Sequence, residues 1–313
     1  MKNLQSLPKA HLHVHLESTV RPATLAEIGG GHVPPRPPVF AGFREFGDHI
    51  SQVRSCLIEP DHFRRIAREF CQDEAAQGTR YAELTFTAAA HGERLGDLGM
   101  PLAAVIEGLA EGQEEHGIEV RLLLDHSRRR TGERAWNTLK LAEKHDEVIG
   151  IGLAGDESHP LAPFAGMLDA ARDAGLHLVH HAGETAGPDS IREALALGHA
   201  ERIGHGIRVL DDPSLVADVK DVPLEVCPFS NVLLGLVAAP QDHPLPRLID
   251  AGLTVTLNTD GETSLVSEYE TARTLFGYGD AVLAGLARAS VDASFAPAPT
   301  KARIRAEIDA WLG

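Results

Sequence analysis

The stretch K-A-H-L-H-V-H-L, residues 9–16, is the segment that decides the fold. It is a short apolar run with a histidine at every second position, which is typical of a buried β-strand. Side chains alternate between the two faces of a strand, so His11, His13 and His15 are expected on one face. If this is the first strand of a barrel, that face is the interior.

Further short apolar runs follow at regular intervals and alternate with amphipathic stretches that predict helices, the clearest at 61–77, 135–146 and 164–174. The tail from residue 279 also has a helical pattern, broken near Pro297 and Pro299. The additional strands are expected at 80–86, 119–125, 148–153, 176–181, 201–205, 223–227 and 253–259. Eight strand–helix alternations predict an α/β fold, a parallel (β/α)₈ TIM barrel.

The chain of 313 residues suits one barrel domain over residues 1–313, because such barrels usually take roughly 250 residues or more. The segment 29–48 interrupts the alternation and is rich in glycine and proline, which predicts a loop. Since it follows the first strand, it is expected to cover one side of the barrel mouth at the C-terminal ends of the strands.

Composition limits the partners of the protein. A net charge of −16 disfavours nucleic acid and anionic membrane surfaces, which leaves a small molecule as the expected partner. No run of about 18 apolar residues is present, so no membrane span is expected. The sparse cysteines, Cys56, Cys71 and Cys227, are typical of a reducing cytoplasm. The oligomeric state cannot be deduced from these features.

Several polar motifs coincide with the ends of predicted strands. Each alone has an ordinary explanation: a chance cluster of histidines, a carboxylate at a helix N-terminus, or an Asx turn. Together they would meet at the barrel mouth, where active sites of this fold are found. The residues are His13 and His15 of H-L-H-V-H, His181 and Glu184 of H-A-G-E, His205 of G-H-G and Asp260 of N-T-D. Imidazole and carboxylate groups are ligands of zinc, so a mononuclear metal site is expected there.

Two other motifs deserve weight. G-I-G-L-A-G, residues 150–155, matches a dinucleotide-binding fingerprint, but D-E-S-H-P follows it where that motif requires a helix. The basic run Arg128, Arg129 and Arg130 follows the third strand. Such a run is usually a solvated loop, although on the mouth side it could contact an anionic part of a substrate.

A set of motifs in this order and spacing resembles the adenosine deaminase family over nearly the whole chain. The set is specific, whereas no single motif is. The motifs are P-K-A-H-L-H-V-H-L-E (8–17), L-A-G-D-E (153–157), H-A-G-E (181–184), R-I-G-H-G (202–206), C-P-F-S-N (227–231) and N-T-D (258–260).

The resemblance implies a zinc-dependent hydrolytic deaminase of a purine nucleoside or a related aminated heterocycle. Glu184 would protonate the ring nitrogen beside the attacked carbon, His205 would orient the metal-bound water, and Asp260 would accept a proton from that water. One zinc per chain would be held by His13, His15, His181 and Asp260. Zinc lowers the pKa of its water to about 7, which suits attack on a ring with a poor leaving group. The resemblance also implies that the backbone of Gly155 contacts the purine and that Glu17 contacts the ribose.

The sequence departs from the family pattern at several positions. The family commonly has an acid at the positions of His11 and Gly152 and a glycine at that of Ser18. It usually has a second acid where Gly261 stands, and that acid pairs with the five-membered ring of the purine. Loss of a buried polar partner costs about 1–3 kcal/mol, so adenosine itself is expected to be a poor substrate.

Two alternatives remain open at this stage. One is zinc hydrolysis of a different C–N bond in an unusual metabolite. The other is a non-catalytic nucleoside-binding relative, which the presence of all inferred ligands disfavours. Glu262, next along the chain after Gly261, could also replace the missing acid.

Overall fold

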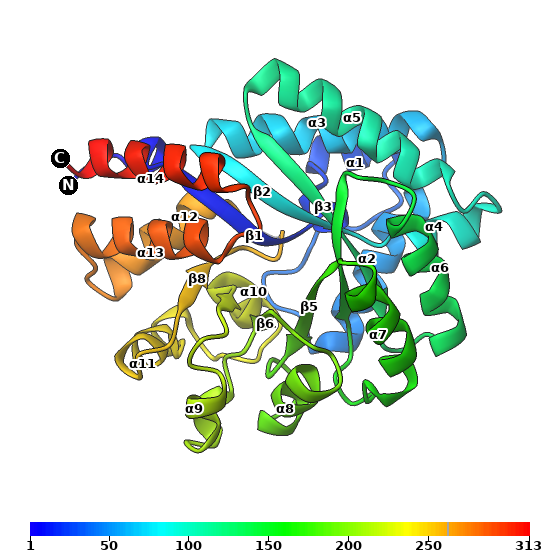
Figure 1. The fold of residues 1–313 in the computed structure, drawn as a ribbon. Coiled ribbons are helices and arrows are strands. Elements are labelled where there is room, and N and C mark those ends of the chain that lie inside the picture. The colour runs from blue at the N-terminus through cyan, green and yellow to red at the C-terminus, as the bar shows by residue number, and fades with distance from the viewer. Residues whose placement is uncertain (262) are drawn as a thin grey trace.

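A computed structural model describes residues 1–261 and 263–313. Its strands form one parallel sheet in sequential order, and an isolated parallel bridge between Val14 and Asp260 closes that sheet into a barrel (Figure 1). The predicted (β/α)₈ barrel is therefore confirmed. The strands are β1 (Lys9–His15), β2 (Thr79–Phe86), β3 (Glu119–Ser127), β4 (Val148–Ala154), β5 (His177–Ala182), β6 (Arg202–His205), β7 (Leu224–Val226) and β8 (Val255–Leu257).

Helices surround the barrel and lie between successive strands (Figure 1). Their apolar faces pack on the outside of the sheet, as the amphipathic stretches predict. The helices are α1 (Pro22–Ile28), α2 (Phe43–Cys56), α3 (Pro60–Ala76), α4 (Ala88–Leu95), α5 (Met100–His116), α6 (Gly132–Ala142), α7 (Ala165–Asp173), α8 (Pro188–Ala196), α9 (Leu215–Asp218), α10 (Pro228–Leu233), α11 (Leu245–Asp250), α12 (Leu265–Leu275), α13 (Asp280–Ala293) and α14 (Ala298–Leu312). In the described residues none of these helices has the length and apolar character needed to cross a membrane.

Strand β1 contains an irregularity that the alternation of its residues did not predict. Its register with β2 shifts between His11 and Val14, and the amides of Leu12 and His13 both donate to Oδ1 of Asn258. Two successive amides on one acceptor are typical of a bulge, which changes the direction of the following side chains. The expectation that His11 joins the other histidines is wrong, because His11 contacts Glu74 of α3 instead.

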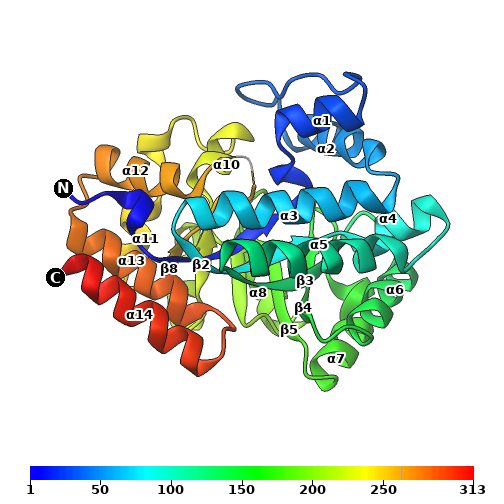
Figure 2. The same cartoon turned by 90° about the horizontal axis from the view of Figure 1, so that it is seen from above.

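The segment 29–48 is a loop only in its first part. Helix α2 begins at Phe43, because Phe43, Phe46, Ile50 and Val53 recur at helical spacing. Figure 2 shows α1 and α2 together beside α3, standing apart from the ring of outer helices. Phe43, Phe46 and Ile50 line a cavity at the barrel mouth, so α2 rather than a glycine-rich loop covers this side. We call residues 17–56 the cap.

Candidate active site at the barrel mouth

Four side chains from three strand ends converge at the mouth. Nε2 of His15 lies 3.2 Å from Nε2 of His181 and 3.3 Å from Oδ1 of Asp260, which in turn lies 3.5 Å from Nε2 of His13. One potential ligand atom from each of the four residues lies within 4.8 Å of all the others. A tetrahedral ion with bonds of about 2.0–2.1 Å has ligands about 3.3 Å apart, so this donor set fits zinc. Nε2 of His13 is buried without a hydrogen-bond partner, as expected for a nitrogen that binds a metal.

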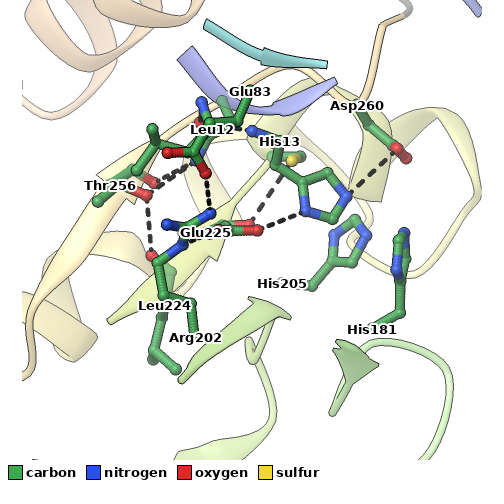
Figure 3. Close-up of polar contacts among 12 residues, drawn as sticks. Leu12, His13, Glu83, His181, Arg202, His205, Leu224, Glu225, Thr256 and Asp260 are labelled. Carbon is green, nitrogen blue, oxygen red and sulfur yellow. Dashed lines mark hydrogen bonds and ion pairs between the residues drawn. The ribbon is translucent and has the colours of Figure 1, made fainter. Parts of the chain in front are cut away.

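A buried ionic network fixes His13 from behind (Figure 3). Its Nδ1 lies 2.9 Å from Oε2 of Glu225 in β7, and Glu225 also pairs with Arg202 of β6. Arg202 is fully buried and pairs with Glu83 of β2 as well. A carboxylate behind a ligating histidine orients the ring and raises its basicity. The network therefore aims His13 at the centre of the cluster.

The charges of the cluster suit a cation. Burial opposes protonation of His13, but Asp260 and Glu225 raise the pKa of His13 to about 10. Burial, aided by the nearby His13, lowers the pKa of His205 to about 3 and that of His181 well below its usual range. Burial also opposes ionisation of Asp260, yet its ion pair with His13 keeps the pKa of Asp260 well below normal. His181 and His205 are therefore neutral beside an ionised Asp260, as metal binding requires, whereas His13 would lose a proton on binding a metal through Nε2.

Glu184 and His205 lie beside the four ligand atoms. Nε2 of His205 is 3.5 Å from Oε1 of Glu184 and is buried without a hydrogen-bond partner. Asn231, in α10, donates to Oε1 of Glu184 at 3.4 Å, and its amide nitrogen lies 3.3 Å from Nδ1 of His205. The side-chain oxygen of Asn231, Oδ1, is 3.1 Å from Nε2 of His243. Asn231 and His243 were not among the residues predicted from the sequence, although Asn231 is in the C-P-F-S-N motif.

A second carboxylate organises the loop that carries Glu184. Glu157 accepts hydrogen bonds from the amides of Gly183, Glu184 and Thr185 at 2.7–2.9 Å. Three amide donors on one buried carboxylate are a strong, directional anchor. The L-A-G-D-E motif thus contributes Glu157, which supports the H-A-G-E turn from the neighbouring strand end.

The backbone at the strand ends adopts conformations that leave room for the clustered side chains. His205 and Asp260 have positive φ angles of 65° and 64°, which are uncommon for residues with side chains and are often found at functional sites. A Cβ at Gly204 would lie 2.7 Å from Cε1 of His13, so only glycine leaves room for that ring. Ser230 donates to Oδ2 of Asp260 at 2.7 Å and fixes the second oxygen of this carboxylate.

A cavity of about 170 Å³ adjoins the cluster and includes His15, His181, Glu184 and Asp260 in its wall. Gly155 lines it, as does Glu17. The Glu17 carboxylate is buried, lies 3.1 Å from His91 and 3.4 Å from Arg54, and leaves Oε2 without a hydrogen-bond partner. Burial opposes its ionisation, but Arg54 and His91 hold the pKa of Glu17 below its usual range.

The three arginines after β3 have different environments. Arg128 is buried and donates to the carbonyl oxygen of His181, and Arg130 pairs with Glu93 of α4. Only Arg129 of the three lines the cavity, and it is exposed. The interpretation of the whole run as a solvated loop is therefore wrong for Arg128, while Arg129 remains available to a substrate.

Gly261 lies against the cap. Its φ is +117°, and a Cβ there would be 2.5 Å from Cβ of Ser18. The residue lines a neighbouring cavity of about 850 Å³ beneath the cap. Ser18 lines both cavities. Ser18 and Gly261, two of the departures from the family pattern, therefore lie side by side. Glu262 lies outside the described residues.

Comparison with known proteins gives a consistent result. Residues 8–311 match the model of the family described as adenosine deaminase. The chain is 36% identical to an aminodeoxyfutalosine deaminase of Streptomyces coelicolor, with 99% of this chain and 86% of the relative covered.

Two solved structures resemble the whole barrel. The adenine deaminase of Arthrobacter aurescens superposes with a TM-score of 0.91 at 31% identity and covers 97% of this chain and 99% of its own. An amidohydrolase of Burkholderia ambifaria with bound Zn gives a TM-score of 0.86 at 27% identity, covering 99% of this chain and 91% of its own.

Proposed function

Because the chain belongs to the adenosine deaminase family, we propose that it is a zinc-dependent hydrolytic deaminase of a purine nucleoside or a related aminated heterocycle. The observation that carries this proposal is the convergence of His13, His15, His181 and Asp260 at one point of the mouth, with Glu184 beside them. These four residues would hold one zinc ion. Bound zinc supplies a water molecule of lowered pKa as the nucleophile.

The residues around the ligands have complementary tasks. Glu184 protonates the ring nitrogen next to the carbon that is attacked, which makes the ring accept electrons. His205, whose Nε2 lies 3.5 Å from Oε1 of Glu184, would orient the attacking water, and Asp260 would accept its proton. Protonation of the amino group then releases ammonia, and proton transfers of this kind typically contribute 10²–10⁴-fold to a rate.

Other residues of the cavity wall would bind the rest of the substrate. Gly155 lines the cavity with its backbone, which allows close approach to a flat ring. Glu17 keeps one buried oxygen without a partner, which makes it a suitable acceptor for a sugar hydroxyl. Arg129 is exposed at the same cavity and can meet a negatively charged extension.

Adenosine is proposed to be a poor substrate compared with the natural one. An acid at position 261 would need the space that Ser18 occupies, and Gly261 provides no side-chain partner for the five-membered ring. A site that lacks a polar partner discriminates differently from one that has it. The cavity beneath the cap, beside Gly261, offers room for a bulkier group.

The test is ammonia release from a panel containing adenine, adenosine, deoxyadenosine, adenosine monophosphate and modified purine nucleosides. The zinc-loaded protein is expected to deaminate at least one of them, with adenosine below about 10⁴ M⁻¹s⁻¹ in kcat/KM, the lower end of the usual range. Glu184→Gln, purified in parallel, is the control for contaminating deaminases.

The alternatives predict other outcomes. Binding of a nucleoside without ammonia release, measured by calorimetry, would indicate a non-catalytic relative. No binding and no release across the panel would favour hydrolysis of a different C–N bond. Either outcome contradicts the proposal.

A further inference from the structure

Each histidine of H-L-H-V-H has a carboxylate near its Nδ1 nitrogen. The three carboxylates come from different elements, α3, β7 and β3, so the pattern is not a consequence of one local motif. The pairs are His11 with Glu74 at 3.1 Å, His13 with Glu225 at 2.9 Å and His15 with Asp125 at 3.8 Å. Of the three pairs, only His15 with Asp125 lines the cavity at the barrel mouth.

Asp125 is placed unusually for a structural acid. It lies near the C-terminal end of β3, is only 4% exposed, and lines the same cavity as His15. Its Oδ1 is buried and has no hydrogen-bond partner in the part of the chain that the structure describes. Its neighbour across the β3–β4 ladder is Gly152, which has no side chain that could engage the carboxylate. A buried carboxylate with so few partners is costly unless something charged or hydrogen-bonding approaches it.

The chemistry of His15 supplies the missing donor. When a neutral imidazole binds a metal through Nε2, its remaining proton is on Nδ1. Nε2 of His15 is the nitrogen that meets His181 and Asp260, so Nδ1 is the nitrogen left to donate. His15 is partly buried at the cavity, and within residues 1–261 and 263–313 the carboxylate oxygen recorded beside its Nδ1 is Oδ2 of Asp125.

We propose that Asp125 is a positioning residue that accepts a hydrogen bond from Nδ1 of His15 and so holds this ligand in the tautomer that binds the metal. The inference rests on the zinc site of the proposed function. At 3.8 Å the pair is longer than a hydrogen bond, and it shortens when a metal on Nε2 keeps the proton on Nδ1. Asp125 thereby does for His15 what Glu225 does for His13.

The experiment measures zinc affinity rather than turnover. Wild type, Asp125→Ala and Asp125→Asn are stripped of metal, and zinc is titrated against a competing chelator. Loss of such a carboxylate typically costs 10–100-fold in metal affinity, so Asp125→Ala is expected to bind zinc at least about 10-fold more weakly. Asp125→Asn is expected to lie between, because its amide oxygen still accepts a hydrogen bond but carries no charge.

Asp156→Asn is the matched control. It removes one negative charge just after β4, but Asp156 accepts from the amide of Ser158 rather than facing an imidazole ligand. Its zinc affinity is expected to equal that of wild type. Cobalt substitution gives a second readout, since the visible spectrum of bound cobalt should shift in both Asp125 variants and not in Asp156→Asn.

The possible results separate the two proposals. Zinc affinity of Asp125→Ala within twofold of wild type, with an unchanged cobalt spectrum, overturns the role of Asp125 alone. If Asp125→Ala does not fold by circular dichroism, Asp125→Asn decides by the same criterion. A wild-type protein that binds no zinc contradicts the proposed function, and the role of Asp125 falls with it. An increase in KM with unaltered zinc affinity would instead identify Asp125 as a substrate contact and overturn the positioning role.

Discussion

The cavity at the barrel mouth has two walls that are built differently. The side that holds the proposed metal ligands, here called the metal side, is made of strand ends, where His13, Asp260 and His205 are buried and contacted by a carboxylate of β7 and by a hydroxyl and an amide of α10. The cap side is made of η2 (Leu16–Thr19) and α2, where Phe46 and Ile50 are only partly buried. In the proposed function, reaction chemistry thus depends on the core of the fold, and recognition depends on an added segment that can vary without disturbing it.

The largest expected effect separates two adjacent histidines of β5. His181→Ala should lose zinc and all measurable turnover. His180→Ala should keep its zinc, because Nε2 of His180 contacts the carbonyl oxygen of Gly198 and Nδ1 accepts from the amide of Leu153. Its cost should instead be stability, on the order of 1–3 kcal/mol for each buried group left unpaired. Metal analysis and thermal unfolding of both variants distinguish these outcomes. Equal zinc content in the two would argue against His181 as a ligand.

Glu184→Gln addresses the metal side without removing a ligand. We expect full zinc content and a loss of turnover of about 10²–10⁴-fold, because glutamine cannot deliver the proton. The hydrogen bond from Asn231 can persist, since the amide oxygen still accepts. Steady-state rates on the best substrate of the panel provide the measurement. Turnover close to wild type would mean that Glu184 is a turn residue only.

A change on the cap side should affect KM rather than turnover. Ile50→Ala removes apolar surface from the wall of the cavity, at about 0.8 kcal/mol for each methylene. We expect a decrease in kcat/KM of about 10-fold, mainly through KM, with zinc content unchanged. Gln52→Ala, exposed on the same helix, is the matched control and should behave as wild type. A decrease in kcat with constant KM would show that the cap shapes the chemistry rather than binding.

The smallest effect on activity is expected from Glu268 of α12, which accepts from the amide of Phe229 where α10 begins. Burial raises the pKa of Glu268 to about 8 from 4.5. Between these values the folded state keeps a proton that the unfolded state releases, so the free energy of unfolding falls as the pH rises from about 4.5 to about 8. Glu268→Gln should remove this part of the pH dependence and retain turnover. Urea unfolding at several pH values tests it, and parallel curves for both proteins would refute it.

The metal side could be deduced from sequence because strand ends of a parallel barrel necessarily meet at one mouth. Short apolar runs predicted the strands, and His13, His15, His181 and Asp260 were placed together from their positions at the strand ends; the structure brings them together, and their role as metal ligands stays a proposal. Within this wall, a buried and paired Glu225 could also be predicted, because a lone acid inside the apolar run P-L-E-V-C needs a buried partner. Asp125 ends a run of leucines in the same way.

Other features depend on contacts that no local pattern reveals. The bulge that separates His11 from the metal ligands is made by the side chain of Asn258, which is distant in sequence. The start of α2 at Phe43 was not predicted, because the glycines and prolines before it indicate a loop. The proximity of Ser18 and Gly261 likewise requires the closed barrel, and it explains why these two departures occur together.

The central claim is that a single zinc ion, held by the metal side, is required for deamination. The most direct measurement is to strip the protein with a chelator, titrate zinc back, and follow ammonia release together with bound metal. The account predicts no activity in the stripped protein and a linear recovery that ends at one zinc per chain. Full activity without metal, or recovery that saturates only at two zinc ions per chain, would contradict it.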